Sequence, residues 1–212
     1  MRSSIIATYT RNEELAGSIT HGIGIVMGIA ATVVLTVKAV ATADPWRIVT
    51  YPLFGLTMIL LYTASTLYHG HADPQYKTRL KVLDHVSIYF LIAGTYTPVT
   101  LVAMRGNWGW TIFAVVWGLA LAGAVFKLFF TGRFPVVSTV LYLAMGWMAA
   151  VAVVPLIQSV PGRSLIWLLA GGLSYTFGVV FYLWHRLPFN HAIWHLFVLG
   201  GTACHVVLVL SL

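Results

Sequence analysis

Residues 18–41 read SITHGIGIVMGIAATVVLTVKAVA, an apolar run whose one formal charge is Lys38. A helix needs about 20 residues to cross the hydrocarbon core of a membrane, so this run is long enough for one crossing. The rest of the chain has the same character: 59% of its 212 residues are apolar and only 8% are charged. A soluble domain carries about 25% charge, and disordered chains are poor in apolar residues. The composition therefore predicts an integral membrane protein.

Six further apolar runs follow, each bounded by turn residues or charges. The predicted helices span residues 18–41, 48–69, 82–103, 108–130, 135–155, 164–185 and 190–212. Seven crossings of about 20 residues use about 140 residues, which leaves no room for a separate soluble domain. We therefore expect one all-α transmembrane domain, 1–212, a seven-helix bundle. The polar stretch 1–14 ahead of a long apolar run lacks the pattern of a cleaved signal peptide.

The distribution of basic residues indicates the orientation, because Lys and Arg accumulate in cytoplasmic loops. An N-terminus in the cytoplasm and a C-terminus outside put the larger group of bases inside. That group is Arg2, Arg11, Lys77, Arg79, Lys81, Lys127, Arg133 and Arg186, and the outer group is Lys38, Arg47, Arg105 and Arg163. The excess of 12 basic over 5 acidic residues thus reflects topology. The sequence has no basic run interleaved with aromatic residues, so a nucleic acid partner is not expected.

Ionisable groups from four predicted helices are expected at one depth. His21 begins the first helix, His69 ends the second, Asp84 begins the third, and His191 and His195 begin the seventh. Odd helices start and even helices end at the cytoplasmic side, so all five groups fall near that face. A single histidine in a membrane helix more often caps a helix end at the membrane interface. Several ionisable groups at the same depth inside a membrane indicate a functional site instead.

The spacing of His191 and His195 suits two ligands of one metal ion, because residues four apart share a helix face. His69 lies at the right depth to be the third ligand. Three protein ligands with a fourth position left to water are typical of a catalytic zinc site. Imidazole ligands favour zinc over magnesium or calcium, which prefer oxygen. We therefore expect Zn2+ at His69, His191 and His195.

Asp84 and Ser65 are the candidate catalytic residues beside this metal. Asp84 is the one acid inside an apolar run, and it could orient the water or accept its proton. Ser65 lies one helical turn before His69 on the same face, so it could bind water or a substrate oxygen. His21 is either a partner of the metal ligands or an interfacial cap, and both readings stay open.

The remaining candidates are expected outside the site. His205 lies about 21 Å beyond His191 along the helix and so belongs to the outer leaflet. His85 points about 100° away from Asp84, which favours packing or contact with lipid. Glu13 and Glu14 precede the first predicted helix, where negative charge suits the helix dipole. Loops or interfaces are expected for His71 and His185, and the single Cys204 excludes an internal disulfide.

An ordered set of motifs covers nearly the whole chain and resembles the hemolysin III proteins, the bacterial branch of the progestin and adipoQ receptor family. The motifs are Glu13-Glu14-Leu-Ala-Gly-Ser-Ile-Thr-His21-Gly-Ile-Gly, Ser65-Thr-Leu-Tyr-His69, Leu83-Asp84-His85, Gly94-Thr-Tyr-Thr-Pro98 and His191-Ala-Ile-Trp-His195. The wider group includes membrane hydrolases such as alkaline ceramidases. The family commonly has Asn four residues before the first-helix histidine, where this chain has Gly17.

The resemblance implies a seven-helix bundle in the bacterial plasma (inner) membrane, with zinc near the cytoplasmic face on residues matching His69, His191 and His195. It places Asp84 and Ser65 close to the metal water, and it implies a role in membrane lipid homeostasis. Eukaryotic relatives look like ceramide-cleaving amidases. The family name reflects a reported pore-forming activity, but no segment here reads as a detachable amphipathic helix or a β-hairpin pore.

Two functions from different classes therefore remain. The first is a zinc-dependent hydrolase of a lipid amide or ester that enters from the bilayer. The second is a non-enzymatic membrane sensor or regulator in which zinc only connects two helices. A transporter or pore ranks last, because the outer halves of the predicted helices offer little polarity beyond His205. The lipid, the signal and the oligomeric state stay open at this point.

Overall fold

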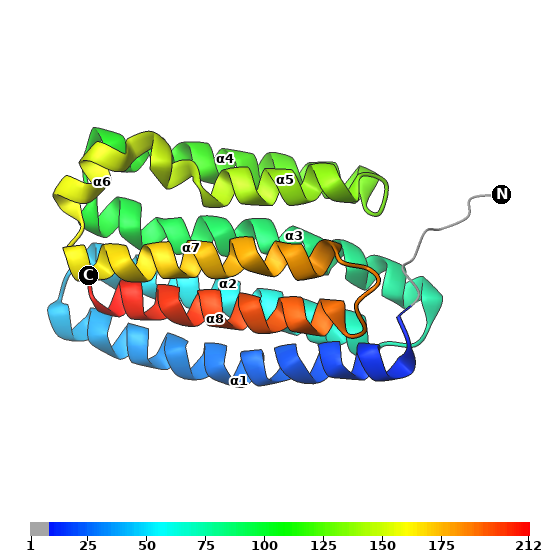
Figure 1. The fold of residues 1–212 in the computed structure, drawn as a ribbon. Coiled ribbons are helices and arrows are strands. Elements are labelled where there is room, and N and C mark those ends of the chain that lie inside the picture. The colour runs from blue at the N-terminus through cyan, green and yellow to red at the C-terminus, as the bar shows by residue number, and fades with distance from the viewer. Residues whose placement is uncertain (1–8) are drawn as a thin grey trace.

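The computed structural model describes residues 9–212, and its regular elements are all helices (Figure 1). The α-helices are α1 (Arg11–Thr42), α2 (Pro45–Gly70), α3 (Pro74–Pro98), α4 (Asn107–Phe130), α5 (Pro135–Gly146), α6 (Val153–Ser159), α7 (Gly162–Leu183) and α8 (Asn190–Leu210). A π-helical turn, Val99–Ala103, extends α3, and a 3-10 segment, Met148–Ala152, joins α5 to α6. Joined in this way, the helices form 7 segments long and apolar enough to cross a membrane. The all-α class and the seven candidate spans are confirmed.

Two helices, α1 and α3, begin earlier than the apolar runs predicted, because polar residues cap their N-terminal ends. At α1, the Thr10 hydroxyl accepts from the Glu13 N–H, and the Glu13 carboxylate accepts from the Thr10 N–H, so the helix begins at Arg11 and not at residue 18. At α3, the Asp73 side chain accepts from the N–H of Gln75, so the helix begins at Pro74 and not at residue 82. Hydropathy identifies the apolar part of a helix, whereas these caps determine the residue at which the helix begins. Arg2, assigned above to the cytoplasmic group, lies outside the described residues.

The fifth span is broken, although the sequence predicted one continuous helix over 135–155. α5 ends at Gly146, and α6 resumes at Val153 after the 3-10 segment. The hydroxyl of Tyr96 on α3 bridges the break: it donates to the Gly146 carbonyl at 2.7 Å and accepts from the Ala149 N–H at 2.9 Å. In a membrane such freed backbone groups need internal partners, so Tyr96 makes the break tolerable.

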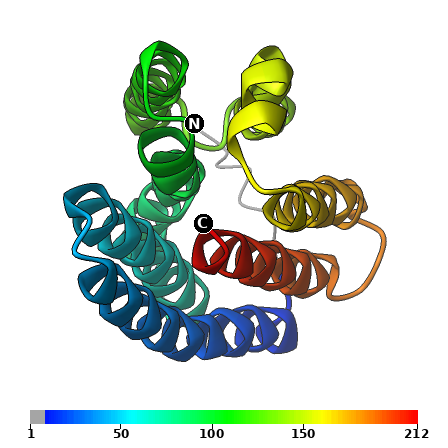
Figure 2. The same cartoon turned by 90° about the vertical axis from the view of Figure 1, so that its left-hand side faces the viewer.

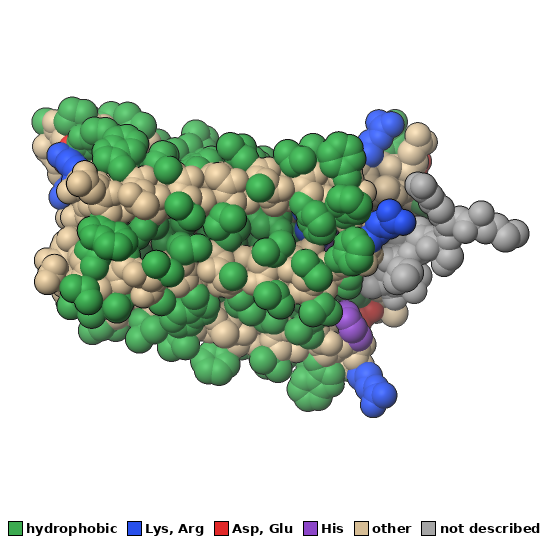
Figure 3. Space-filling view, turned by 90° about the horizontal axis from the view of Figure 1, so that it is seen from above, with side chains coloured by type: hydrophobic (Ala, Val, Ile, Leu, Met, Phe, Trp, Pro, Cys, Tyr) green, Lys and Arg blue, Asp and Glu red, His purple; other side chains and the backbone are tan. Residues whose placement is uncertain are grey.

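The helices form a bundle in which α8 lies between α1 and α7 (Figure 2). Small residues allow the closest approaches. A Cβ at Gly24 would lie 2.9 Å from the ring of Tyr62, so α1 packs directly against α2 at this point. The side of the bundle in Figure 3 is covered by hydrophobic side chains, and the Lys and Arg side chains lie at its two ends. This distribution fits a membrane protein, and the orientation of the bundle stays a prediction.

Candidate metal centre

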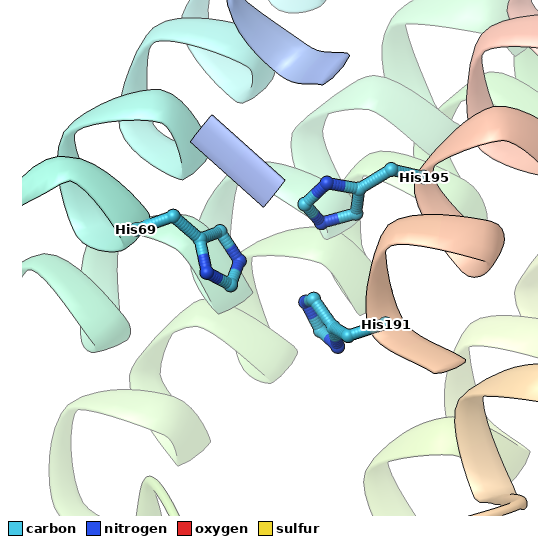
Figure 4. Close-up of side chains that lie close together, drawn as sticks. All are labelled: His69, His191 and His195. Atoms are coloured by element: carbon cyan, nitrogen blue, oxygen red, sulfur yellow. The ribbon is translucent and has the colours of Figure 1, made fainter. Parts of the chain in front are cut away.

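Three histidines from two helices converge (Figure 4), where α2 ends and α8 begins. His69 comes from the last turn of α2, and His191 and His195 come from the first turns of α8. Potential ligand nitrogens of the three all lie within 4.8 Å of one another. His69 and His195 are buried, and His191 is half-buried. The structure therefore brings together the three residues predicted as metal ligands.

Each of these rings is held through its Nδ1 atom. The Glu14 carboxylate lies 2.8 Å from Nδ1 of His69, and the Tyr9 hydroxyl lies 3.2 Å from Nδ1 of His191. Nδ1 of His195 is shared between the Thr20 hydroxyl at 3.0 Å and a backbone carbonyl of α1 at 3.2 Å. A carboxylate or carbonyl that accepts from Nδ1–H leaves the lone pair on Nε2.

This pattern is typical of metal-binding histidines, which donate their second N–H to a carboxylate, carbonyl or hydroxyl. Nε2 of His69 is buried and has no hydrogen-bond partner among residues 9–212. A buried polar atom without a partner needs an explanation, and a metal ion at this atom would supply one. The donor set thus fits a metal ion that accepts imidazole nitrogen.

The two candidate catalytic residues line a cavity that His191 and His195 also line. Asp84 and Ser65 are both buried, with 6% and 0% of their surface exposed. Within the described chain the Ser65 hydroxyl makes no hydrogen bond of good geometry, and the Asp84 carboxylate is a polar group close to it. His21, also buried, stacks on His195 with ring centroids 3.5 Å apart and planes 11° apart.

The cavity has a volume of about 440 Å³ and extends from the histidines along the bundle. Its walls come from α3, the α5–α6 span, α7 and α8, and apart from the cluster they are largely apolar. His205 lines it farther along α8 and is not part of the metal cluster. His85 also lines the cavity, so the structure shows packing, one of the two expectations for this residue; its backbone carbonyl accepts a hydrogen bond from the Tyr142 hydroxyl on α5. A cavity of this size can hold a small molecule or part of a lipid.

Comparison with known proteins gives a consistent result. The family model described as "Haemolysin-III related" matches residues 9–206. The chain is 48% identical over 191 residues to "Hemolysin-3" of Bacillus cereus, covering 90% of this chain and 87% of that protein. It is 47% identical over 202 residues to the "Hemolysin-3 homolog" of Bacillus subtilis (strain 168), covering 95% of each. It is 31% identical over 201 residues to the human "Monocyte to macrophage differentiation factor", covering 91% of this chain and 81% of that protein.

The chain belongs to the haemolysin III-related family. The resemblance inferred from its motifs is confirmed, and all five motifs lie within the matched residues.

Two residues that hold the histidines of this haemolysin III-related protein were missed in the sequence. Glu14 was assigned to the helix dipole, but its carboxylate also pairs with His69 and with Lys77. The sequence does contain a signal that Glu14 faces the histidine cluster: it lies seven residues before His21, and residues seven apart share a helix face. Tyr9 gave no signal, since nothing in the sequence connects it to His191. Burial, followed by the nearby Tyr182 and acidic groups, raises the pKa of Tyr9, so its phenol stays neutral.

Gly17, the departure from the usual family pattern, has a structural role at the centre. A Cβ at this position would lie 2.9 Å from Cγ of His69, so the imidazole ring occupies the space that a side chain would take. The carbonyl of Gly17 is the backbone group that accepts from Nδ1 of His195. In this chain Gly17 therefore allows the His69 ring to pack closely against α1, and its carbonyl holds the His195 ring.

Proposed function

We propose that this haemolysin III-related protein is a zinc-dependent membrane hydrolase that cleaves an amide or ester bond of a lipid and so contributes to membrane lipid homeostasis. One observation carries the proposal: three imidazoles gather beside a largely apolar cavity, and their Nδ1 atoms are held by residues of α1 or by Tyr9, two residues before that helix. Zinc is the metal that we assign to His69, His191 and His195, because it prefers such nitrogen ligands and needs no redox partner.

The chain's own residues have distinct parts in this proposal. When bound, zinc supplies a Lewis acid that polarises a carbonyl and makes water acidic at neutral pH. Asp84, shielded from bulk water by burial, accepts a proton of the attacking water on a carboxylate oxygen and returns it to the amine or alcohol that leaves as the C–N or C–O bond breaks. The Ser65 hydroxyl, which makes no hydrogen bond of good geometry among the described residues, donates to the carbonyl oxygen of the substrate as negative charge develops there. The apolar walls of the cavity hold the hydrocarbon part of the lipid.

The membrane location also enters the proposal. We place the protein in a bacterial plasma membrane, with the N-terminus in the cytoplasm and the histidine cluster near the cytoplasmic face. Support comes from the bacterial relatives and from the excess of basic residues on the predicted inner side. The substrate then reaches the cavity from the bilayer, and its polar group lies at the depth of the cluster.

Two substitutions test the assignment. His191→Ala should remove zinc from the purified protein, because two imidazoles hold the ion far less tightly than three. Asp84→Asn should keep zinc and lose hydrolysis of a panel of lipid amides and esters. His71→Ala is the matched control, since His71 is exposed in the loop after α2. One equivalent of zinc in His191→Ala would refute the ligand set, and full hydrolysis in Asp84→Asn would refute the role of Asp84.

One observation also favours a second function. The histidines belong to α2 and α8, so a bound ion would connect two helices that are far apart in sequence. The protein could then act as a non-enzymatic sensor or regulator with a structural zinc. In that case zinc removal lowers thermal stability, while neither the wild type nor Asp84→Asn hydrolyses any lipid on the panel.

A further inference from the structure

Two lysines at the same end of the bundle as the histidines have no carboxylate partner. Lys127, in the last turn of α4, is only 2% exposed. Lys81, near the start of α3, is half-buried. Among residues 9–212 neither ammonium group takes part in an ion pair. A buried ammonium that makes no ion pair is costly, so its presence inside a membrane span indicates a ligand.

The acids of the chain are engaged elsewhere. The sequence has 5 acidic residues. Glu13 caps α1, Asp73 caps α3, Glu14 pairs with His69 and Lys77, and Asp44 pairs with arginines at the other end of the bundle. Only Asp84 remains, and its carboxylate is 3.6 Å from His85 and lines the cavity of the metal centre. Two positive charges therefore share one carboxylate, which the proposed reaction also uses.

A series of contacts connects the side chain of Lys127 to the backbone of Lys81. The Lys127 ammonium lies 5.9 Å from the centroid of the Tyr142 ring. The Tyr142 hydroxyl donates to the carbonyl of His85 at 2.9 Å, and Nδ1 of His85 lies 2.8 Å from the carbonyl of Lys81. Lys127 is also close enough to Lys81 and Asp84 to interact with both charges. The dipole of α4 favours a cation in its last turn, but it does not explain a second ammonium on α3.

We propose that the phosphate of a membrane phospholipid binds between Lys81 and Lys127. Both lysines lie near helix ends, Lys81 in the second turn after the start of α3 at Pro74 and Lys127 in the last turn of α4. Lipid phosphates lie at this depth, and basic pockets between membrane helices bind such headgroups. A phosphodiester has two unesterified oxygens, so one oxygen can accept from each ammonium.

This binding site lies outside the cavity of the proposed reaction, although its two lysines share the charge of Asp84. His85, Asp84 and Tyr142 line the cavity, whereas Lys81 and Lys127 are not among its lining residues. The phospholipid is therefore a bound regulator or structural lipid on the α3–α4 side, and its binding does not depend on hydrolysis. Zinc content and lipid hydrolysis report on the proposed function, and lipid retention reports on this binding site.

Retention of phospholipid by the full-length protein in detergent tests the proposal. The probe is phosphatidylglycerol, compared with diacylglycerol that has the same acyl chains, and retention is read by native mass spectrometry. We expect the wild type to retain phosphatidylglycerol and not diacylglycerol. Lys127→Met and Lys81→Gln should each lower the affinity by about tenfold, the size of one charge-assisted hydrogen bond. Lys127→Arg should restore retention, and Arg79→Gln, a change at an exposed base on α3, should have no effect.

Other sources of the anion give distinct results. Competition by inorganic phosphate at low millimolar concentration would show a site for free phosphate and overturn the lipid assignment. Retention of oleate in place of phosphatidylglycerol would show a carboxylate site and overturn it as well, as would equal retention by Lys127→Met and the wild type. If Lys127→Met does not fold, crosslinking of the wild-type protein with a photoreactive phosphatidylglycerol tests the proposal instead. Adducts at the start of α3 or the end of α4 support the proposal, and adducts only elsewhere refute it.

Discussion

The carboxylate of Glu14 lies 2.8 Å from Nδ1 of His69, and its other oxygen lies 2.8 Å from the ammonium of Lys77. One acid at the start of α1 thus fixes a ring at the end of α2 and a base on α3. The cluster is held through α1 although none of its three histidines belongs to that helix. Orientation of metal ligands by such outer contacts affects both affinity and geometry.

Glu14→Gln should lower zinc affinity by about 10- to 100-fold, the usual effect of losing an outer partner of a metal ligand. The amide keeps the size of the side chain but removes the charge that makes the His69 ring more basic. Competition with a chelator of known affinity measures the change. Asp73→Asn is the control, because Asp73 is an exposed acid that caps α3 and touches none of the three histidines. Equal affinity in Glu14→Gln and the wild type would show that the contact is not functional.

Gly17→Ala should displace the ring of His69, because the new Cβ would lie 2.9 Å from Cγ of that ring. Overpacking of this kind costs about 1–3 kcal/mol, and here it also misplaces a ligand. We expect a lower melting temperature and a lower zinc content. Gly22→Ala on the same helix is the matched control, since its Cβ would come no closer than 4.0 Å to Thr66. If both variants match the wild type, α1 adjusts without disturbing the centre.

The apolar runs and the depth of the histidines could be read from the sequence for simple physical reasons. A bilayer imposes a long apolar run on each crossing, so the runs predicted the spans. Alternating direction then put His69 and His195 at one level, and the structure brings them together. Both inferences depend only on the order of residues along the chain.

The break in the fifth span and the contacts of the centre depend on packing, and the sequence did not reveal them. Residues 146–152 are as apolar as a continuous helix, and the break is stabilised by Tyr96 from another helix. The contact of Tyr9 with His191 joins opposite ends of the chain, and no periodicity records it. Helix starts were misplaced because caps such as Thr10 are polar and lie outside the apolar runs.

Asp44 should make stability depend on acid pH at the opposite end of the bundle. Burial raises the pKa of this carboxyl, but hydrogen bonds from the Trp46 N–H and Arg105, with the charges of Arg105 and Arg47, lower it overall from its ordinary value of 3.8. A lowered pKa in the folded state stabilises the protein above the unfolded pKa, and this contribution is lost as the pH falls through the folded value.

Asp44→Ser separates this charge effect from capping, because Ser also caps helices well. The variant should lose at most about 1 kcal/mol near pH 7, as expected for exposed ion pairs, and the difference from wild type should shrink below about pH 4. Thermal unfolding between pH 3 and pH 7 measures it. Asp73→Ser is the matched control, since Asp73 caps α3 in the same way but pairs with no arginine among the described residues. The same pH profile in both variants would contradict the role of Arg105.

Tyr96→Phe should destabilise the fifth span. The change removes the hydroxyl that pairs with both the Gly146 carbonyl and the Ala149 N–H, and it leaves these two backbone groups without partners beside an apolar cavity. An unsatisfied buried polar group costs about 1–3 kcal/mol, so the melting temperature in detergent should fall by several degrees. Tyr51→Phe is the control, because the Tyr51 hydroxyl is buried and has no hydrogen-bond partner among residues 9–212. Its removal should be neutral or stabilising, so an equal loss in both variants would mean that the bridge across the break contributes nothing beyond packing.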